Sequence, residues 1–472
     1  MGSDMEQLYA KRLKRYVTAM RNGKPDRVPI RPFVAEFTAA YAGYTCQEVA
    51  HDYNKAFEAA RKCAAEFDWD AVVGNMVYVW TGLTQAIGLK YYGVPGVDIP
   101  PDTGFQYREP PEEKAFMGPD EYDDLIADPV GFLYNTWLPR ASTDVVPVGQ
   151  PATLRSNLSF VKGAMAMLQY FYAFGPQGQA LREQSGTVGA IAGILKAPMD
   201  ILADKFRGYL GLCTDLIERP GKVQAACEAL APHLLHVALS GADPDKNVPV
   251  TIWMHRGCVP FVSPKHFETI YWPTLKPIIE NIWAAGHQTL FYAEGNWNAH
   301  LESFAELPAG SIVYHVDQDD IFDVHKRLGR KFAISGGIPN FLLCYRSPQE
   351  VKDYCKKVID GVAGDGGYIM DASAIVQNHA KVENMRAMTD ACHEYGDYGS
   401  SAWDNDGLAE TDSTGEHYEF QDLAKKPGVC IPWADKLKEL PEIPGDAQLV
   451  QRVWEDIDTL AYVYIWQVLL SF

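Results

Sequence analysis

The chain has 472 residues, with 61 acidic and 42 basic side chains, so its formal net charge is −19. This acidic balance argues against nucleic acid as a partner, because general binding to phosphates needs a cationic surface. The 47% content of hydrophobic residues is enough for a large core and argues against disorder.

Two further features concern the compartment. The sequence has no apolar run of about 18 residues or more, which is the length that a membrane-spanning helix needs. Its nine cysteines are widely spaced, an odd number, and never form a Cys-x-x-Cys motif. This usage is typical of a reducing compartment. We therefore expect a cytoplasmic protein without a membrane partner.

The first part of the chain mixes helices with long loops. The spacing of apolar residues predicts a helix over about 4–22 and a second helix from Tyr53 to Phe67. A short buried strand is expected from Asp70 to Asn75. The stretch of about 91–150 is rich in Pro, Gly and acidic residues, so we expect loops and short helices there.

The second half alternates short apolar runs with amphipathic stretches, which is the βαβα pattern of a parallel sheet. The predicted strands are Val248–His255, Gln288–Glu294, Ser311–Val316, Lys331–Ser335 and Gly367–Asp371. The predicted helices are Pro264–Ala285, Asn298–Glu306, Ile321–Leu328, Pro348–Val362 and Val382–Tyr395. Because no strand is followed by a dinucleotide-type glycine loop, the pattern favours a (β/α)8 TIM barrel over a doubly wound sheet.

We expect one domain over residues 1–472, with a barrel core at about 25–396. A helical extension precedes this core, and two long insertions interrupt or follow it at about 91–150 and 396–445. A C-terminal helix over about 446–472 has an apolar stripe at helical spacing. That helix would pack on the core or form a homodimer.

Two polar side chains stand at neighbouring predicted strand ends. Glu294 ends one strand and His315 lies at the end of the next. In a parallel barrel the carboxyl ends of the strands face the reacting volume. A carboxylate in an apolar segment is unfavourable unless it is paired or bound to a metal. The two groups could converge on one cation, hydrogen-bond to each other, or stay separate.

Other strand-end residues and nearby aromatic side chains complete the candidate site. We predict three catalytic residues: His255, Tyr292 and Asp317. We predict three substrate-binding residues: Asn75, Trp80 and Trp297. The two tryptophans could wall a pocket for a planar substrate, or they could belong to the core.

Three segments carry a family resemblance. They are PDRVPIRPFVAEFTAAYAG (Pro25–Gly43), EAARKCAAEFDWDAVVGN (Glu58–Asn75) and SGGIPNFLLCYRSPQEVKDYCKKVID (Ser335–Asp360). These segments resemble the uroporphyrinogen decarboxylase-like superfamily, many members of which are corrinoid-dependent methyltransferases. The resemblance covers most of residues 25–396. It implies a TIM barrel with its site at the carboxyl ends of the strands.

The metal motif of this superfamily is altered in the chain. Thiol-activating members typically bind zinc through His-x-Cys, where this chain has Tyr292-Ala293-Glu294. The sequence is more similar to the methyltransferase component of corrinoid-dependent aryl O-demethylases, whose zinc motif is Glu-x14-Glu-x20-His. Glu294 and His315 fit the second half of that motif.

The first half of the motif is displaced by one residue. Ile279 stands at the place of the first Glu, and Glu280 is its neighbour. The resemblance therefore implies a Zn2+ site made by Glu294, His315 and either Glu280 or His255.

The function implied by this resemblance is O-demethylation. A zinc-dependent methyltransferase would move the methyl group of an aryl methyl ether to the cobalt(I) of a separate corrinoid (cobalamin) protein. His255 or Tyr292 would assist the leaving phenolate. The alternatives are a uroporphyrinogen decarboxylase-type decarboxylase, which the fold permits, and a non-enzymatic corrinoid- or porphyrin-binding protein.

Overall fold

The computed structural model describes residues 2–74, 81–111, 114–376, 378–399 and 427–471. Its centre is a six-stranded sheet in the order β10-β9-β8-β7-β6-β5, and every neighbouring pair is parallel. The strands are β5 (Gly193–Lys196), β6 (Val250–Met254), β7 (Thr289–Ala293), β8 (Ile312–Val316), β9 (Ala333–Gly336) and β10 (Tyr368–Ile369). The predicted parallel sheet is confirmed.

Two smaller sheets accompany the central one. β1 (Ala71–Val72) pairs in parallel with β4 (Val188–Gly189), and β2 (Tyr92–Gly93) pairs antiparallel with β3 (Gln106–Tyr107). Single parallel bridges join Ile30 to Met370 and Phe33 to Val73. The chain thus has a mixed α/β fold in which the segment around residues 30–34 reaches both the end of β10 and the end of β1.

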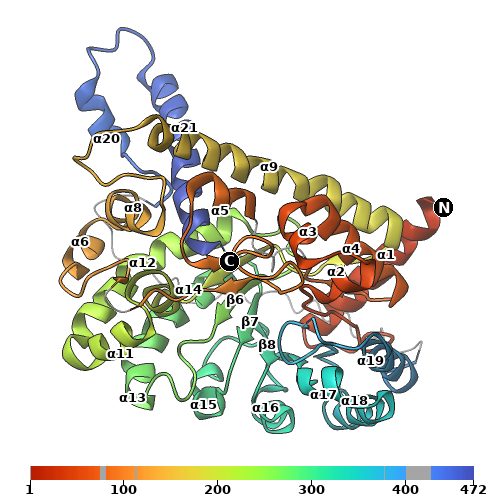
Figure 1. The fold of residues 1–472 in the computed structure, drawn as a ribbon. Coiled ribbons are helices and arrows are strands. Elements are labelled where there is room, and N and C mark those ends of the chain that lie inside the picture. Colours follow the sequence, from red (N-terminus) through yellow and green to blue (C-terminus); the bar gives the residue numbers. More distant parts are fainter. Residues whose placement is uncertain (1, 75–80, 112–113, 377, 400–426, 472) are drawn as a thin grey trace.

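Helices surround the sheet (Figure 1). In the first half they are α1 (Gly2–Met20), α2 (Phe37–Ala42), α3 (Cys46–His51), α4 (Tyr53–Glu66), α5 (Thr81–Ile87), α6 (Tyr122–Ala127), α7 (Pro129–Phe132), α8 (Leu138–Ala141), α9 (Leu154–Ser185), α10 (Pro198–Ile201), α11 (Tyr209–Glu218) and α12 (Pro220–Ser240). In the second half they are α13 (Pro264–His266), α14 (Trp272–Ala284), α15 (Leu301–Phe304), α16 (Ile321–Leu328), α17 (Asn340–Tyr345), α18 (Pro348–Val362), α19 (Val382–Tyr395), α20 (Trp433–Lys436) and α21 (Ala447–Leu470). None of the helices described is both long and apolar enough to cross a membrane.

Three predicted helices are confirmed residue for residue: α16, α18 and α19. Local signals explain the accuracy at α18. Ser347 caps the helix by accepting a hydrogen bond from the Glu350 backbone N–H, and the Glu350 side chain accepts in return from the Ser347 backbone. Pro348 at the first helical position already has the backbone angle that a helix needs.

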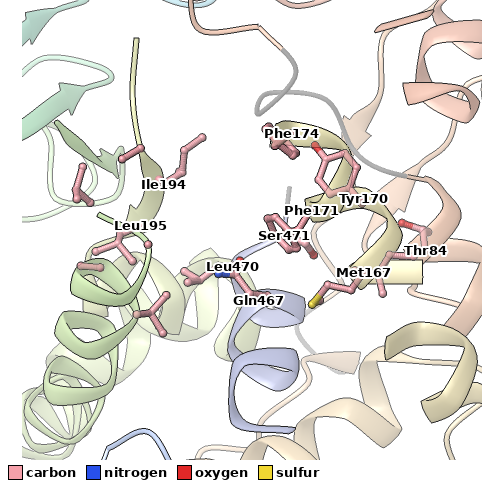
Figure 2. Close-up of a pocket in the computed structure, with 17 residues that line it drawn as sticks. Thr84, Met167, Tyr170, Phe171, Phe174, Ile194, Leu195, Gln467, Leu470 and Ser471 are labelled. Carbon is pink, nitrogen blue, oxygen red and sulfur yellow. The ribbon is translucent and has the colours of Figure 1, made fainter. Parts of the chain in front are cut away.

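Helix α9 crosses the upper part of the view in Figure 1 and packs against α1, α4 and α5. Between it, α5, β5 and the end of α21 lies a cavity of about 260 Å³ (Figure 2). Its walls are mostly apolar and include Met167, Phe171, Ile194 and Leu470. Part of the inner face of α9 therefore borders a void instead of a close-packed core.

A buried carboxylate fixes the N-terminal helix to the body. Asp70 is fully buried just before β1, and its Oδ1 atom lies 2.5 Å from Arg15 Nη1 and 3.0 Å from Arg27 Nη2. Its other oxygen accepts the backbone N–H of Ile30 at 2.9 Å. One side chain thus ties α1 and the 30–34 segment to β1.

Replacement of Asp70 tests this clamp. We expect Asp70→Asn to lower the free energy of unfolding by about 3–5 kcal/mol, because it leaves buried arginines without their charge partner. The matched control is Asp68→Asn, since Asp68 also pairs with an arginine, Arg12, but is 57% exposed. That change should lower the free energy by about 1 kcal/mol or less. Urea denaturation followed by circular dichroism measures both, and equal losses would contradict the clamp.

Candidate active site

A cleft of about 480 Å³ opens at the carboxyl edge of the sheet. Part of its polar lining comes from residues at or just after the ends of β5, β6, β7 and β8, as expected for a parallel α/β fold. These residues are Lys196, His255, Arg256, Glu294 and Gln318. Its aromatic lining comes partly from the 91–150 region and comprises Tyr92, Phe105, Tyr107, Trp253 and Phe261.

Strand register sorts the strand-end residues into two rows. Trp253 pairs with Tyr292, Tyr292 with His315, and His315 with Ser335, so these four side chains form one lower row across the sheet. The next pairs, Met254 with Ala293 and Ala293 with Val316, end the ladders. One residue further on, His255, Glu294 and Asp317 follow at a common height. We call these three residues the upper row.

The lower row is closed to the cleft at Tyr292 and His315, which are fully buried. The Tyr292 ring is stacked between Trp253 and His315, with ring centroids 4.1 and 4.4 Å apart. His315 Nδ1 lies 3.0 Å from Ser335 Oγ, and Nε2 lies 3.1 Å from the Ser373 carbonyl oxygen. Burial, together with the charge of Arg31, holds the pKa of His315 well below its ordinary value. Its imidazole is therefore neutral.

The upper row carries a charge cluster around His255. Its Nε2 atom lies 2.9 Å from Asp204 Oδ2, and the same carboxylate binds Lys196 Nζ at 2.8 Å and Arg256 Nε at 2.9 Å. Burial alone would raise the pKa of Asp204, but the charges of His255 and Lys196 outweigh it and hold that pKa well below the usual range. Asp204 is thus a permanent anion that orients the imidazole.

A second carboxylate fixes the loop after β6. The Asp200 Oδ1 atom accepts the backbone N–H groups of His255 and Arg256 at 2.8 and 2.9 Å, and Oδ2 accepts from the Tyr271 hydroxyl at 2.8 Å. Asp200 and Asp204 stand one helical turn apart on the segment after β5. Neither aspartate was predicted from the sequence as a site residue. Their signal is the four-residue spacing of Lys196, Asp200 and Asp204 directly after a strand.

The carboxylates of Glu294 and Asp317 stand next to each other in the upper row. Glu294 Oε2 accepts from Trp253 Nε1 at 2.7 Å, and Asp317 Oδ2 accepts the backbone N–H of Gly295 at 2.8 Å. Burial raises the pKa of Asp317 to about 6; the Gly295 amide opposes this shift and the charge of Glu294 adds to it. The pair therefore combines a carboxylate in the cleft with an acid that can hold a proton near neutral pH.

A buried lysine is a further component of the site that was not predicted from the sequence. Lys205 lines the cleft, with Nζ 4.0 Å from the Tyr91 ring centroid and 3.2 Å from the Tyr92 hydroxyl. Nζ also donates to the Ser471 carbonyl at 3.0 Å. Burial, and then the charge of Lys196, hold the pKa of Lys205 well below its usual range. No local motif in the sequence distinguishes this lysine from a surface one.

The predicted site residues are thus only partly brought together. His255 and Glu294 line the cleft, and Asp317 supports it from behind Gly295. Tyr292 lies in the lower row, too deep for the direct contact with a substrate that we expected of a catalytic residue. Trp297 is also fully buried, and its Nε1 donates to the Glu294 carbonyl at 2.9 Å, so it positions the loop and does not line the cleft. Asn75 and Trp80 lie outside the described residues.

The predicted zinc ligands do not converge in this structure. His315 lies two residues deeper than Glu294, about 7 Å along the strand direction, and both of its ring nitrogens have neighbours. Glu280 lies on α14, 3.9 Å from Lys276, and does not line the cleft. His255 is level with Glu294, but its Nε2 faces Asp204. Among the described residues, no group of three His, Cys, Asp or Glu side chains could hold a metal ion.

The fold and the cleft define an α/β protein with its site at the carboxyl edge of a parallel sheet. Residues 175–395 match the family model of uroporphyrinogen decarboxylase (URO-D). A curated uroporphyrinogen decarboxylase from Ruthia magnifica subsp. Calyptogena magnifica is 26% identical over 76 residues, which cover 16% of this chain and 22% of that protein.

A solved structure shares the fold over a longer span. The methyltransferase from Methanosarcina mazei has a TM-score of 0.54 and 16% sequence identity, and the match covers 81% of this chain and 98% of that one. Together these findings show a sequence similarity of residues 175–395 to uroporphyrinogen decarboxylases and a fold shared with a methyltransferase structure.

The raised pKa of Asp317 has a consequence for stability. Between about pH 4 and pH 6 the folded protein keeps the Asp317 proton, whereas the unfolded chain has released it. The unfolded state then binds fewer protons, so the free energy of unfolding falls as the pH rises through this window, by up to about 3 kcal/mol. Urea denaturation of the wild type and of Asp317→Asn at several pH values measures this contribution as their difference.

We expect that difference to change across the window and to become constant above it. The control is Glu294→Gln, which removes a charge that raises the Asp317 pKa. This variant should lower that pKa, so that the pH range over which the stability changes ends at a lower pH. A difference between wild type and Asp317→Asn that is independent of pH would contradict the assigned burial of this acid.

Proposed function

We propose that this chain is a methyltransferase that removes the methyl group of an aryl methyl ether and passes it to the cobalt(I) of a separate corrinoid protein. One observation carries the proposal. The cleft joins aromatic walls, suited to a planar ring, with an imidazole and a carboxylate placed level with each other at its polar end. The superfamily and its methyltransferase relatives support the same reaction class.

The reaction requires a leaving group to be stabilised. In methyl transfer from an ether, the bond between the methyl carbon and the aryl oxygen breaks, and the oxygen leaves with the bonding electron pair. The corrinoid, when its carrier protein is bound, would supply the nucleophile that takes the methyl group. The remaining task for this chain is to hold the ring and to place positive charge or a proton at the aryl oxygen.

His255 is suited to that task. The anionic Asp204 faces Nε2, and Asp200 Oδ1 lies 3.5 Å from Nδ1, so two carboxylates flank the ring. Arg256 and Lys196 share the same Asp204 carboxylate and add positive charge beside the cleft. In the proposal, the leaving oxygen replaces Asp204 as the partner of His255 Nε2 and receives its proton, and Glu294 accepts a hydrogen bond from a hydroxyl group on the ring.

The expected zinc ion has no part in this mechanism, because the residues predicted to bind it do not fit a zinc site as they are arranged. The closed eight-stranded barrel, in contrast, belongs to the proposal. The bridges from Ile30 to Met370 and from Phe33 to Val73 support it, because they place the 30–34 segment between β10 and β1.

The decarboxylase alternative is less favoured by the charges in the cleft. A porphyrinogen carries several carboxylates, and a site for it needs cations directed at them. Lys196 and Arg256 both contact Asp204 instead, and burial lowers the pKa of Lys205. The cluster is suited to one developing negative charge and not to many permanent ones.

Replacement of His255 tests the proposed role. With a cobalt(I) corrinoid as acceptor and guaiacol, vanillate or veratrole as donor, the appearance of methyl-cobalt absorbance reports the reaction. We expect His255→Gln to lower the rate by about 10²- to 10⁴-fold, because the leaving phenolate loses its proton donor. The matched control is His393→Gln, since His393 is a partly exposed histidine on α19 that does not line the cleft. That variant should keep the wild-type rate.

The dependence on the leaving group identifies the role of the imidazole. A nitro-substituted anisole releases a more acidic phenol and needs less help from an acid, so the loss caused by His255→Gln should shrink with that donor. An equal loss with both donors would show that His255 binds the substrate without donating a proton. Absence of methyl transfer from every ether by the folded wild-type protein would overturn the proposed function.

A further inference from the structure

The outer face of α9 carries an exposed apolar stripe. Six of its side chains are between 44% and 81% exposed: Leu154, Leu158, Val161, Met165, Leu168 and Tyr172. Their spacings are 4, 3, 4, 3 and 4 residues, which is the heptad repeat of a helix that packs along another helix. We call these six residues the α9 seam.

The opposite face of the same helix is also apolar. Met167 and Phe174 line the cavity in Figure 2, and Gly163 is buried where α9 crosses α21, against Tyr464. Between Arg155 and Arg182 the helix has a single charged residue, Lys162. A helix that is apolar on both faces is normally buried on both. In a chain with a net charge of −19, this uncharged surface indicates a contact that the single chain does not make.

We propose that the α9 seam is the interface with a second copy of this chain, and that the two α9 helices pack antiparallel about a twofold axis level with residue 163. In such a pair, residue i faces residue j when their numbers have a constant sum. The seam satisfies this condition at every position. Leu154 would face Tyr172 of the partner subunit, Leu158 would face Leu168 of the partner subunit, and Val161 would face Met165 of the partner subunit, each pair being centred on residue 163.

The size of the α9 seam agrees with an interface to a second copy of the chain. The six side chains expose on the order of 700 Å² on each copy, near the roughly 800 Å² per partner of a standard stable interface. The heptad spacing is the geometry of helix–helix packing, and the chain itself supplies the matching helix. An anionic membrane is disfavoured, because the seam has only Arg155 and Lys162 beside it and the whole chain is acidic. The proposal does not depend on the reaction that the cleft performs.

The oligomeric state tests the proposal. Light scattering after size-exclusion chromatography of the full chain at micromolar concentration should give the mass of a dimer. The double variant Val161→Glu/Met165→Glu, which changes the central pair, should give the mass of a monomer. The matched control is Leu210→Glu/Ile217→Glu, two exposed apolar residues on α11, and it should stay dimeric. Circular dichroism confirms that each variant is folded.

The antiparallel register has a test of its own. Val161→Glu and Met165→Lys should each weaken the dimer. A mixture of the two variants should restore it, because the new carboxylate at position 161 of one copy would meet the new ammonium group at position 165 of the other. A parallel pair would place each residue opposite its own equivalent, and mixing would not restore those contacts. A monomeric wild type, including one that binds anionic vesicles through α9, would overturn the proposal, as would a dimer that the double variant leaves intact.

Discussion

The candidate site depends on the lateral register of β6, β7 and β8. Backbone hydrogen bonds between parallel strands fix which residues share a height, and side chains on one face recur every two residues. Glu294 is therefore level with His255 and Asp317, whereas His315 is level with Tyr292, one row further down. A shift of two residues separates groups that face the cleft from groups that fill the interior. The chemistry that the chain can perform follows from this separation.

Buried carboxylates hold the upper row in place. Asp200 fixes the backbone of the loop after β6, and Asp204 fixes the His255 ring and two cations. Both aspartates are almost completely buried, where an unpaired charge would be strongly unfavourable, so each depends on its partners as much as they depend on it. The same arrangement recurs at Asp70, which joins α1 to β1. Charge pairs of this kind position the elements that hydrophobic packing alone would leave free to slide.

The elements that were predicted correctly are those that local sequence signals determine. The helices α16, α18 and α19 have strong apolar periodicity, and α16 and α18 also have capping residues, so their limits were correct. That Glu294 and His315 lie in different rows could not be predicted. The number of residues between two strand ends does not reveal which residues of the two strands are paired. Asp204 was missed because two of its partners, His255 and Arg256, come from a distant segment. Helix α9 was missed because apolar residues on both faces hide its periodicity.

A crystal structure with a bound methoxylated ring, such as guaiacol, would show how the cleft holds its substrate. We expect the ring to lie between the aromatic walls of the cleft, with its ether oxygen near His255 and its hydroxyl near Glu294, and with His315 still enclosed below. A metal ion bridging Glu294 and His315, or the ring bound in the cavity beneath α9, would contradict the two-row description of the site.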